Sequence, residues 1–124
     1  MNPPGDAAIL DAIELTLLPG VGCLTQNRIW KAFPDISGFF SAGDNAFESF
    51  GIGGEAQGAL RSRGYRPMAE EIVAWCGRED CRLLLRGHSG YPPLLEEIYH
   101  PPLVLYARGH LAALENPCIA IVGT

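Results

Sequence analysis

The sequence has no apolar run that approaches the roughly 20 residues needed to span a bilayer. Its first six residues, Met-Asn-Pro-Pro-Gly-Asp, contain no basic segment followed by an apolar one, so no secretory signal peptide is expected. A long coiled coil is excluded as well, because 15 glycines and 10 prolines interrupt the 124 residues. We therefore expect a cytoplasmic protein of short elements with no membrane partner.

Metal-binding and catalytic spacings are also missing. No Cys-x-x-Cys pair occurs, and we expect free thiols at four positions, Cys23, Cys76, Cys81 and Cys118. Two of these, Cys76 and Cys118, lie within apolar runs, which is typical of small core residues. The histidines lie in predicted turns, without a partner at catalytic or metal spacing: His88, His100 and His110. The sequence therefore predicts no catalytic residue, no metal and no cofactor, and a protein that is not an enzyme.

Negative charge dominates, with a net charge of −5, but it is unevenly distributed. Residues 1–60 contain seven acids and only two bases, Arg28 and Lys31, whereas residues 61–90 contain six arginines and four acids. A domain that binds DNA by itself normally has a basic stripe, since counterion release from phosphates supplies much of the affinity. The first half of the chain is thus predicted to bind DNA weakly or to contact a protein.

Apolar periodicity predicts helices throughout residues 1–80. A helix capped by Asp6 has Ile9, Ile13 and Leu17 on one face, and a second helix over about residues 24–33 ends at Pro34. Further helices are expected after a cap at Asp35, from Asp44 through Phe50, and from Pro67 to about Glu79 with Trp75 in the core. Three arginines follow residue 60, namely Arg61, Arg63 and Arg66. They are either an electrostatic footprint or cations facing a helix dipole and water.

A glycine turn joins the first two helices. Its residues Gly20, Val21 and Gly22 resemble the helix-hairpin-helix motif, in which glycine amides approach a DNA phosphate and the central apolar residue is buried between the helices. A purely structural turn is the alternative, because glycines permit positive φ in any tight connection of two helices. The pattern recurs 31 residues later as Gly51-Ile52-Gly53, and two such hairpins packed together predict a compact bundle of four or five short helices.

The pattern changes after residue 80, where we place a domain boundary. Strands are predicted over residues 83–85, 103–107 and 119–122, with a short helix opened by Pro92-Pro93 between the first two. The last strand has no polar alternation, as expected for a strand buried on both faces of a parallel sheet. Gly123 and Thr124 follow it directly, which is typical of the phosphate-binding turn that begins a doubly wound α/β domain.

The same region resembles a known family. The residues concerned match in type and spacing the front of the DprA family, the bacterial DNA-processing protein also called Smf: Tyr91-Pro92, Leu95, Ile98, Pro102, the strand at 103–107, Gly109, and Ile119-Ala120-Ile121-Val122-Gly123. The resemblance implies a sterile-alpha-motif-like helical domain over residues 1–80 and, over residues 81–124, the truncated start of a Rossmann-like DNA-binding domain. Gly123 and Thr124 would then form part of its DNA phosphate pocket.

For the whole family member the resemblance further implies single-stranded DNA binding, loading of the recombinase RecA in natural transformation, and a homodimer. Two other functions fit the residues. Rossmann-type domains that begin Ile-Val-Gly-Thr also occur in phosphoribohydrolases acting on nucleotides, and small acidic helical bundles often serve as protein-interaction modules. The expected fold is mainly α, with a helical bundle followed by the first strands of an α/β domain.

Overall fold

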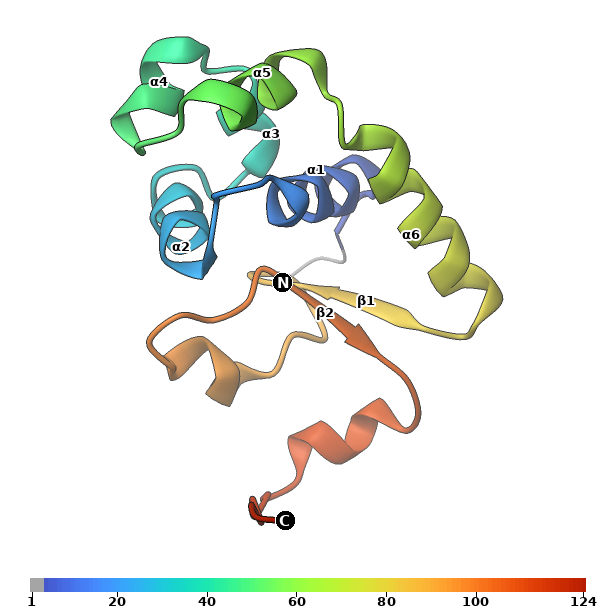
Figure 1. The fold of residues 1–124 in the computed structure, drawn as a ribbon. Coiled ribbons are helices and arrows are strands. Elements are labelled where there is room, and N and C mark those ends of the chain that lie inside the picture. The colour runs from blue at the N-terminus through green and yellow to red at the C-terminus, as the bar shows by residue number, and fades with distance from the viewer. Residues whose placement is uncertain (1–3) are drawn as a thin grey trace.

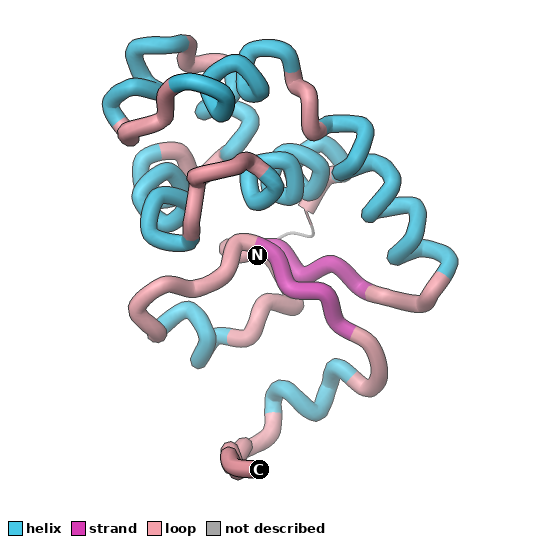
Figure 2. The backbone as a smooth tube through the Cα atoms, in the orientation of Figure 1, coloured by secondary structure: helices cyan, strands magenta, loops and turns pink. Residues whose placement is uncertain are grey.

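A computed structural model describes residues 4–124 as a mainly helical fold, as predicted (Figure 1). The α-helices are α1 (Asp6–Leu17), α2 (Cys23–Ala32), α3 (Ile36–Phe40), α4 (Asp44–Ser49), α5 (Gly54–Ser62) and α6 (Arg66–Arg78). They are followed by strand β1 (Arg82–Leu85), the 3₁₀ helix η1 (Pro93–Glu97), strand β2 (Val104–Ala107) and the 3₁₀ helix η2 (Leu111–Glu115). Figure 2 shows the α-helices gathered above the two strands and the two 3₁₀ helices below them.

Helix α1 lies at the centre of the bundle and contacts α3, α6 and both strands. Ala12, Ile13 and Leu15 are fully buried, because the helix is covered on several sides. The predicted cap at Asp6 is wrong: Gly5 occupies the N-cap position and Asp6 is the first helical residue. An acid in the first turn still interacts favourably with the helix dipole. The predicted cap at Asp35 is confirmed, since its side chain accepts a hydrogen bond from the backbone N–H of Ser37.

The two glycine turns have the same backbone geometry. Gly20 and Gly51 have φ of +76° and +77°, a left-handed conformation that glycine adopts without strain. The next residue in each turn, Val21 or Ile52, is buried, and the second glycine of each turn takes the extended N-cap conformation of the following helix, α2 or α5. The repeat that the sequence indicates at a 31-residue offset is therefore present in the structure.

Five phenylalanines form one aromatic cluster around Phe39, which is fully buried. The centroid of its ring lies 5.2–6.1 Å from those of the other four, Phe33, Phe40, Phe47 and Phe50. Tilted and edge-on pairs at such distances stabilise a core beyond simple area burial. The short helices α3 and α4 are thereby held to α2 although neither is long enough to be stable alone.

Two acids of α1 are buried and paired with arginines. Asp11 accepts hydrogen bonds from Ser37, Arg63 and Arg66, and Glu14 lies 3.1 Å from Nε of Arg63. The sequence predicted either an electrostatic footprint or cations that face a helix dipole and water. Both predictions are wrong for Arg63 and Arg66, because these side chains neutralise carboxylates that would otherwise be buried without a partner. Arg61 instead forms an exposed ion pair with Asp44 at 2.8 Å.

Strands β1 and β2 form an antiparallel pair in which Leu83 faces Tyr106 and Leu85 faces Val104. Leu85, Leu103 and Val104 are buried in the same hydrophobic core as α1 and α5. The core thus includes side chains from both sides of residue 80, where the sequence places a domain boundary. The division into two domains stays a prediction.

Three further predictions for individual side chains or segments are wrong. Residues 119–122 form no strand, and Ile119, Ile121 and Val122 are more than nine-tenths exposed, because nothing within residues 4–124 pairs with them. Cys118 is exposed for the same reason, whereas Cys76 is buried as predicted. Burial and the neighbouring Cys81 raise the pKa of Cys76 to about 11, which keeps it a neutral thiol. Trp75 is 47% exposed rather than part of the core.

The buried position of Val21 leads to a prediction. Val21→Asp should lower the free energy of unfolding by several kcal/mol, out of the roughly 5–15 kcal/mol typical of a domain, because a carboxylate would be buried without a partner. Leu24→Asp is the matched control, since Leu24 is 58% exposed in the first turn of α2. Urea denaturation followed by circular dichroism measures both. Equal midpoints for the two variants would contradict the buried role of Val21.

Candidate nucleic-acid interface

The first glycine turn exposes the N-terminus of α2. Gly20 and Gly22 are exposed while Val21 is buried between the helices. No side chain caps α2, and its first turn contains no acid. Backbone N–H groups at such an end attract anions, because they lack helical partners and carry the positive end of the dipole. A methyl group at Gly22 would meet no atom within 4 Å, so the surface over this turn is open.

The second glycine turn is less suited to an anion despite its matching backbone. Helix α5 begins after Gly53 and has Glu55 in its first turn. A carboxylate there already satisfies the positive end of the helix dipole and repels phosphate. Of the two repeats, the turn at residues 20–22 is therefore the better candidate for phosphate contact.

One face of α2 extends this site with positive charge. Leu24, Arg28 and Lys31 follow one another at spacings of four and three residues, so their side chains project from the same side of the helix. All three are exposed. Arg28 lies 5.5 Å from the centroid of the Phe50 ring, and within residues 4–124 neither Arg28 nor Lys31 forms an ion pair. The two bases of the acidic half thus lie on one exposed face of α2, with Lys31 in the last turn, at the opposite end of the helix from the open N-terminus.

An aromatic side chain completes this face. Tyr99 is 92% exposed, and its ring lies edge-on to His100 with 5.0 Å between centroids. Both residues follow η1, and with α2 they line a hollow of about 290 Å³, whose walls are Leu24, Asn27, Arg28, Lys31, Tyr99 and His100. Exposed aromatic rings beside basic side chains are the features on which single-stranded nucleic acids stack and are neutralised. We call these six residues the α2 face.

A buried arginine holds the η1 segment against α2. Arg86, at the end of β1, is 5% exposed, and its guanidinium carbon lies 3.9 Å from the centroid of the Trp30 ring. It donates hydrogen bonds to Oδ1 of Asn27 at 2.6 Å and to Oε1 of Glu96 at 2.7 Å. Asn27 in turn donates to the carbonyl of Pro101 at 3.2 Å. This network fixes the position of Tyr99 and His100 relative to α2.

Tyr91 supports the same segment from the other side. Its hydroxyl donates a hydrogen bond of 2.7 Å to the carbonyl of Pro102. Burial, with a further contribution from the Glu96 carboxylate, raises the pKa of Tyr91 to about 12. The phenol therefore stays protonated and able to donate at neutral pH.

The residues that the sequence singles out are not all brought together. Gly20, Val21 and Gly22 lie beside the α2 face, whereas Gly123 and Thr124 lie at the C-terminal end, below the strand pair and away from α2 (Figure 1). Gly123 has φ of +144° and both residues are exposed. Their role as part of a phosphate pocket stays a prediction, as does DNA contact by the hairpin.

The α2 face is not apparent as a site from the sequence. In the sequence, Arg28 and Lys31 are only two bases in a region with seven acids. Their three-residue spacing within a predicted helix was the one pattern that could have placed them on the same face. Tyr99 and His100 are about 70 residues away in the chain and no pattern links them to α2. Within residues 4–124 no group of His, Cys, Asp or Glu side chains could hold a metal ion, and no helix is long and apolar enough to cross a membrane.

Part of the chain matches a known protein family. Residues 82–124, about a third of the chain, match the family model described as DNA recombination-mediator protein A. The resemblance to the DprA family is confirmed for this part of the chain. No curated protein and no solved structure matches the chain. The matched residues include Arg86, Tyr91, Glu96 and both prolines whose carbonyls accept the hydrogen bonds described above.

The buried network around Arg86 yields a prediction. Arg86→Met should lower the free energy of unfolding by about 1–3 kcal/mol, because the Asn27 amide oxygen loses its partner and the Glu96 carboxylate loses its charge-assisted bond. The loss is moderate since Glu96 is partly exposed to water. Urea denaturation measures it, with the exposed Arg82→Met as control. Hydrogen exchange should also become faster in residues 93–107. Unchanged exchange there would show that the network does not hold this segment.

Proposed function

We propose that this chain is the N-terminal portion of a DprA-like protein that binds single-stranded DNA and loads RecA onto it during DNA uptake, without catalysing a reaction itself. The observation that carries this proposal is the match of residues 82–124 to DNA recombination-mediator protein A. The match also favours this function over that of a nucleotide-processing phosphoribohydrolase. The composition of the α2 face supports a polyanionic ligand independently, because it combines an exposed aromatic ring with two bases that form no ion pair within residues 4–124. The open N-terminus of the same helix adds a second group that attracts anions.

Two contacts with DNA are proposed, and they differ in strength. Gly123 and Thr124 would hold one phosphate through a backbone amide and a hydroxyl, as part of a pocket in the Rossmann-like domain. The α2 face would contact a neighbouring stretch of the strand. With only Arg28 and Lys31 against the net charge of −5, its contribution is expected to be weak, in the range of roughly 10⁻⁴–10⁻⁶ M that is typical of nonspecific contacts.

Salt dependence tests the α2 face directly. Arg28→Gln combined with Lys31→Gln should weaken the binding of a fluorescein-labelled oligothymidylate. The slope of log K against log salt should become shallower by about 1.4, since each phosphate contact on a single strand contributes about 0.7. Fluorescence anisotropy at several salt concentrations measures both quantities.

The matched control removes two exposed arginines elsewhere, Arg82→Gln with Arg108→Gln, which changes the net charge by the same amount. If binding depends only on total charge, the slope of log K against log salt will become shallower by the same amount in both double variants. That result would show that the α2 face is not the DNA-binding site. Tyr99→Ala should weaken binding with no change of slope, because stacking on an aromatic ring does not release counterions.

Recognition of RecA is the second part of the proposal. The acidic helical bundle would supply the surface that contacts RecA, because small acidic bundles often serve as protein-interaction modules, and a homodimer of the complete protein belongs to the same proposal. Purified RecA should be retained by immobilised chain more strongly with single-stranded DNA present than without it. Retention that is equally weak in both conditions, and no greater than on an immobilised unrelated acidic protein, would contradict RecA as a partner of this part of the protein.

A further inference from the structure

Two cysteines meet at the C-terminal end of α6. Cys76 lies in the last turn of the helix and is 2% exposed, and Cys81 follows the helix and is half-buried. The backbone N–H of Cys81 donates a hydrogen bond of 2.9 Å to the carbonyl of Cys76. A bond over this span is typical of the Schellman motif that ends many helices. The side chains at these two positions of the motif frequently contact each other, so the helix end brings two thiols together.

The backbone conformation of Asp80 produces this approach. Its φ of +52° is left-handed, a region that residues other than glycine rarely adopt, and it reverses the chain just before Cys81. A carbonyl oxygen lies about 2.4 Å from its own Cα, and an amide nitrogen about 1.5 Å from its own. The hydrogen bond therefore holds the Cα atoms of Cys76 and Cys81 within about 6.8 Å of each other. Disulfides join residues whose Cα atoms are roughly 4.4–6.8 Å apart, so this pair lies within bonding range.

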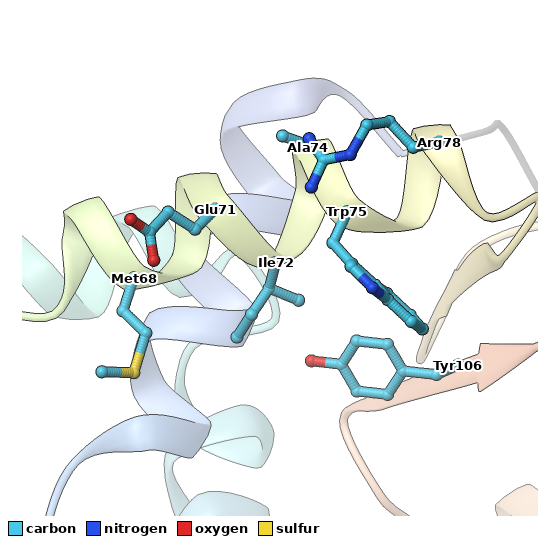
Figure 3. A pocket seen from close by; sticks show the side chains of 7 residues that line it. All are labelled: Met68, Glu71, Ile72, Ala74, Trp75, Arg78 and Tyr106. Atoms are coloured by element: carbon cyan, nitrogen blue, oxygen red, sulfur yellow. The ribbon is translucent and has the colours of Figure 1, made fainter.

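The electrostatics of the neighbouring groups place the two thiols together as well. Burial raises the pKa of Cys76 most, and a hydrogen bond and a charge interaction with Cys81 raise it further. The pKa of Tyr106 is raised by burial and then by Cys76 and Cys81. Tyr106 belongs to β2 and faces Trp75 across an open groove of about 640 Å³ beside α6 (Figure 3). The thiol pair is thus near this groove, and Cys81 is the member that solvent reaches.

We propose that Cys76 and Cys81 form a reversible disulfide, a redox modification site that small oxidised thiols close and dithiol reductants open. The Cys81 thiolate attacks one sulfur of a low-molecular-weight disulfide, so that a mixed disulfide forms and one small thiol leaves as its thiolate. The sulfur of Cys76 then attacks that of Cys81, gives up its proton to water and displaces the second small thiol. The two protein sulfurs lose two electrons in total, and the small disulfide gains them.

This disulfide would connect the helices to the strands. Cys76 belongs to α6 and Cys81 directly precedes β1, so oxidation closes a loop across the boundary that the sequence places near residue 80. A closed loop restricts the unfolded chain more than the folded one. The oxidised protein should therefore unfold at a higher urea concentration than the reduced protein. Reversible bonds of this kind are typical of redox sensing, and this inference does not depend on DNA binding.

A chain that keeps only this pair of cysteines provides the test. The other two, Cys23 and Cys118, are exposed and are replaced by serine. Equilibration with glutathione disulfide at about pH 8, where accessible thiols are partly ionised, should make the chain two hydrogen atoms lighter with no glutathione attached. Peptide mapping should then show residues 76 and 81 joined. In one glutathione buffer, the ratio of oxidised to reduced chain should be about tenfold or more higher for native than for urea-denatured protein.

Matched variants separate the roles of the two thiols. Cys76→Ala in the same background should stop at one glutathione on Cys81, because no second thiol displaces it. Cys81→Ser should stay unmodified while circular dichroism shows it folded, because the remaining thiol is buried. The double variant Cys76→Ala with Cys81→Ser, made in the natural chain, keeps the two exposed thiols. These lie in α2 and near the C-terminal end, so two glutathiones should attach and no internal bond should form (Figure 1).

Three results would overturn the proposal. The first is a glutathione adduct on Cys81 that persists at equilibrium although Cys76 is present. The second is a disulfide between two chains in place of one within the chain, which a non-reducing gel distinguishes. The third is a ratio of oxidised to reduced chain that is no higher for native than for urea-denatured protein.

Discussion

The buried guanidinium of Arg86 is the interaction on which the arrangement of the C-terminal segment depends. It stacks on Trp30 of α2 and donates to Asn27 and Glu96, so a single side chain at the end of β1 contacts the helical bundle and η1 together. A buried cation requires such compensation, because an unpaired charge away from water is strongly unfavourable. The position of the loop that includes Tyr99, and hence the α2 face, follows from satisfying this one group.

A second cluster of buried charges explains why the chain has an arginine-rich region. Arg63 and Arg66 neutralise Asp11 and Glu14 of α1, and Arg61 pairs with Asp44. Most of the positive charge in residues 61–90 is thus used within the fold and is not available to a phosphate backbone. The candidate interface depends instead on the smaller charge of α2. The acidic half of the chain is therefore less repulsive toward DNA than its composition indicates, because two of its seven acids are buried and paired.

Short-range patterns predicted much of the fold. The helices at residues 6–17, 23–32 and 66–78 follow from apolar periodicity and from prolines and glycines at their ends, and the paired turns follow from the repeated glycines. The strand expected over residues 119–122 is absent, because a β-strand is stable only when neighbours satisfy its backbone groups, and local composition does not specify those neighbours. The exposure of Trp75 was missed for a related reason, since periodicity places a residue on a face without determining what covers that face.

The sequence by itself determined which segments are helical, where they end, and that the two glycine turns share one backbone geometry, because these properties depend on residues within a few positions of each other. Only the tertiary structure decided which charged and polar side chains pair with one another. Asp11 meets Arg63 across 52 residues and Asn27 meets Arg86 across 59, and no periodicity encodes such pairs. The α2 face and the groove beside α6 arise in the same way, since each combines a helix with a side chain of a distant segment, Tyr99 or Tyr106. Long-range packing sets these distances, and electrostatic interactions depend on distance rather than on separation along the chain.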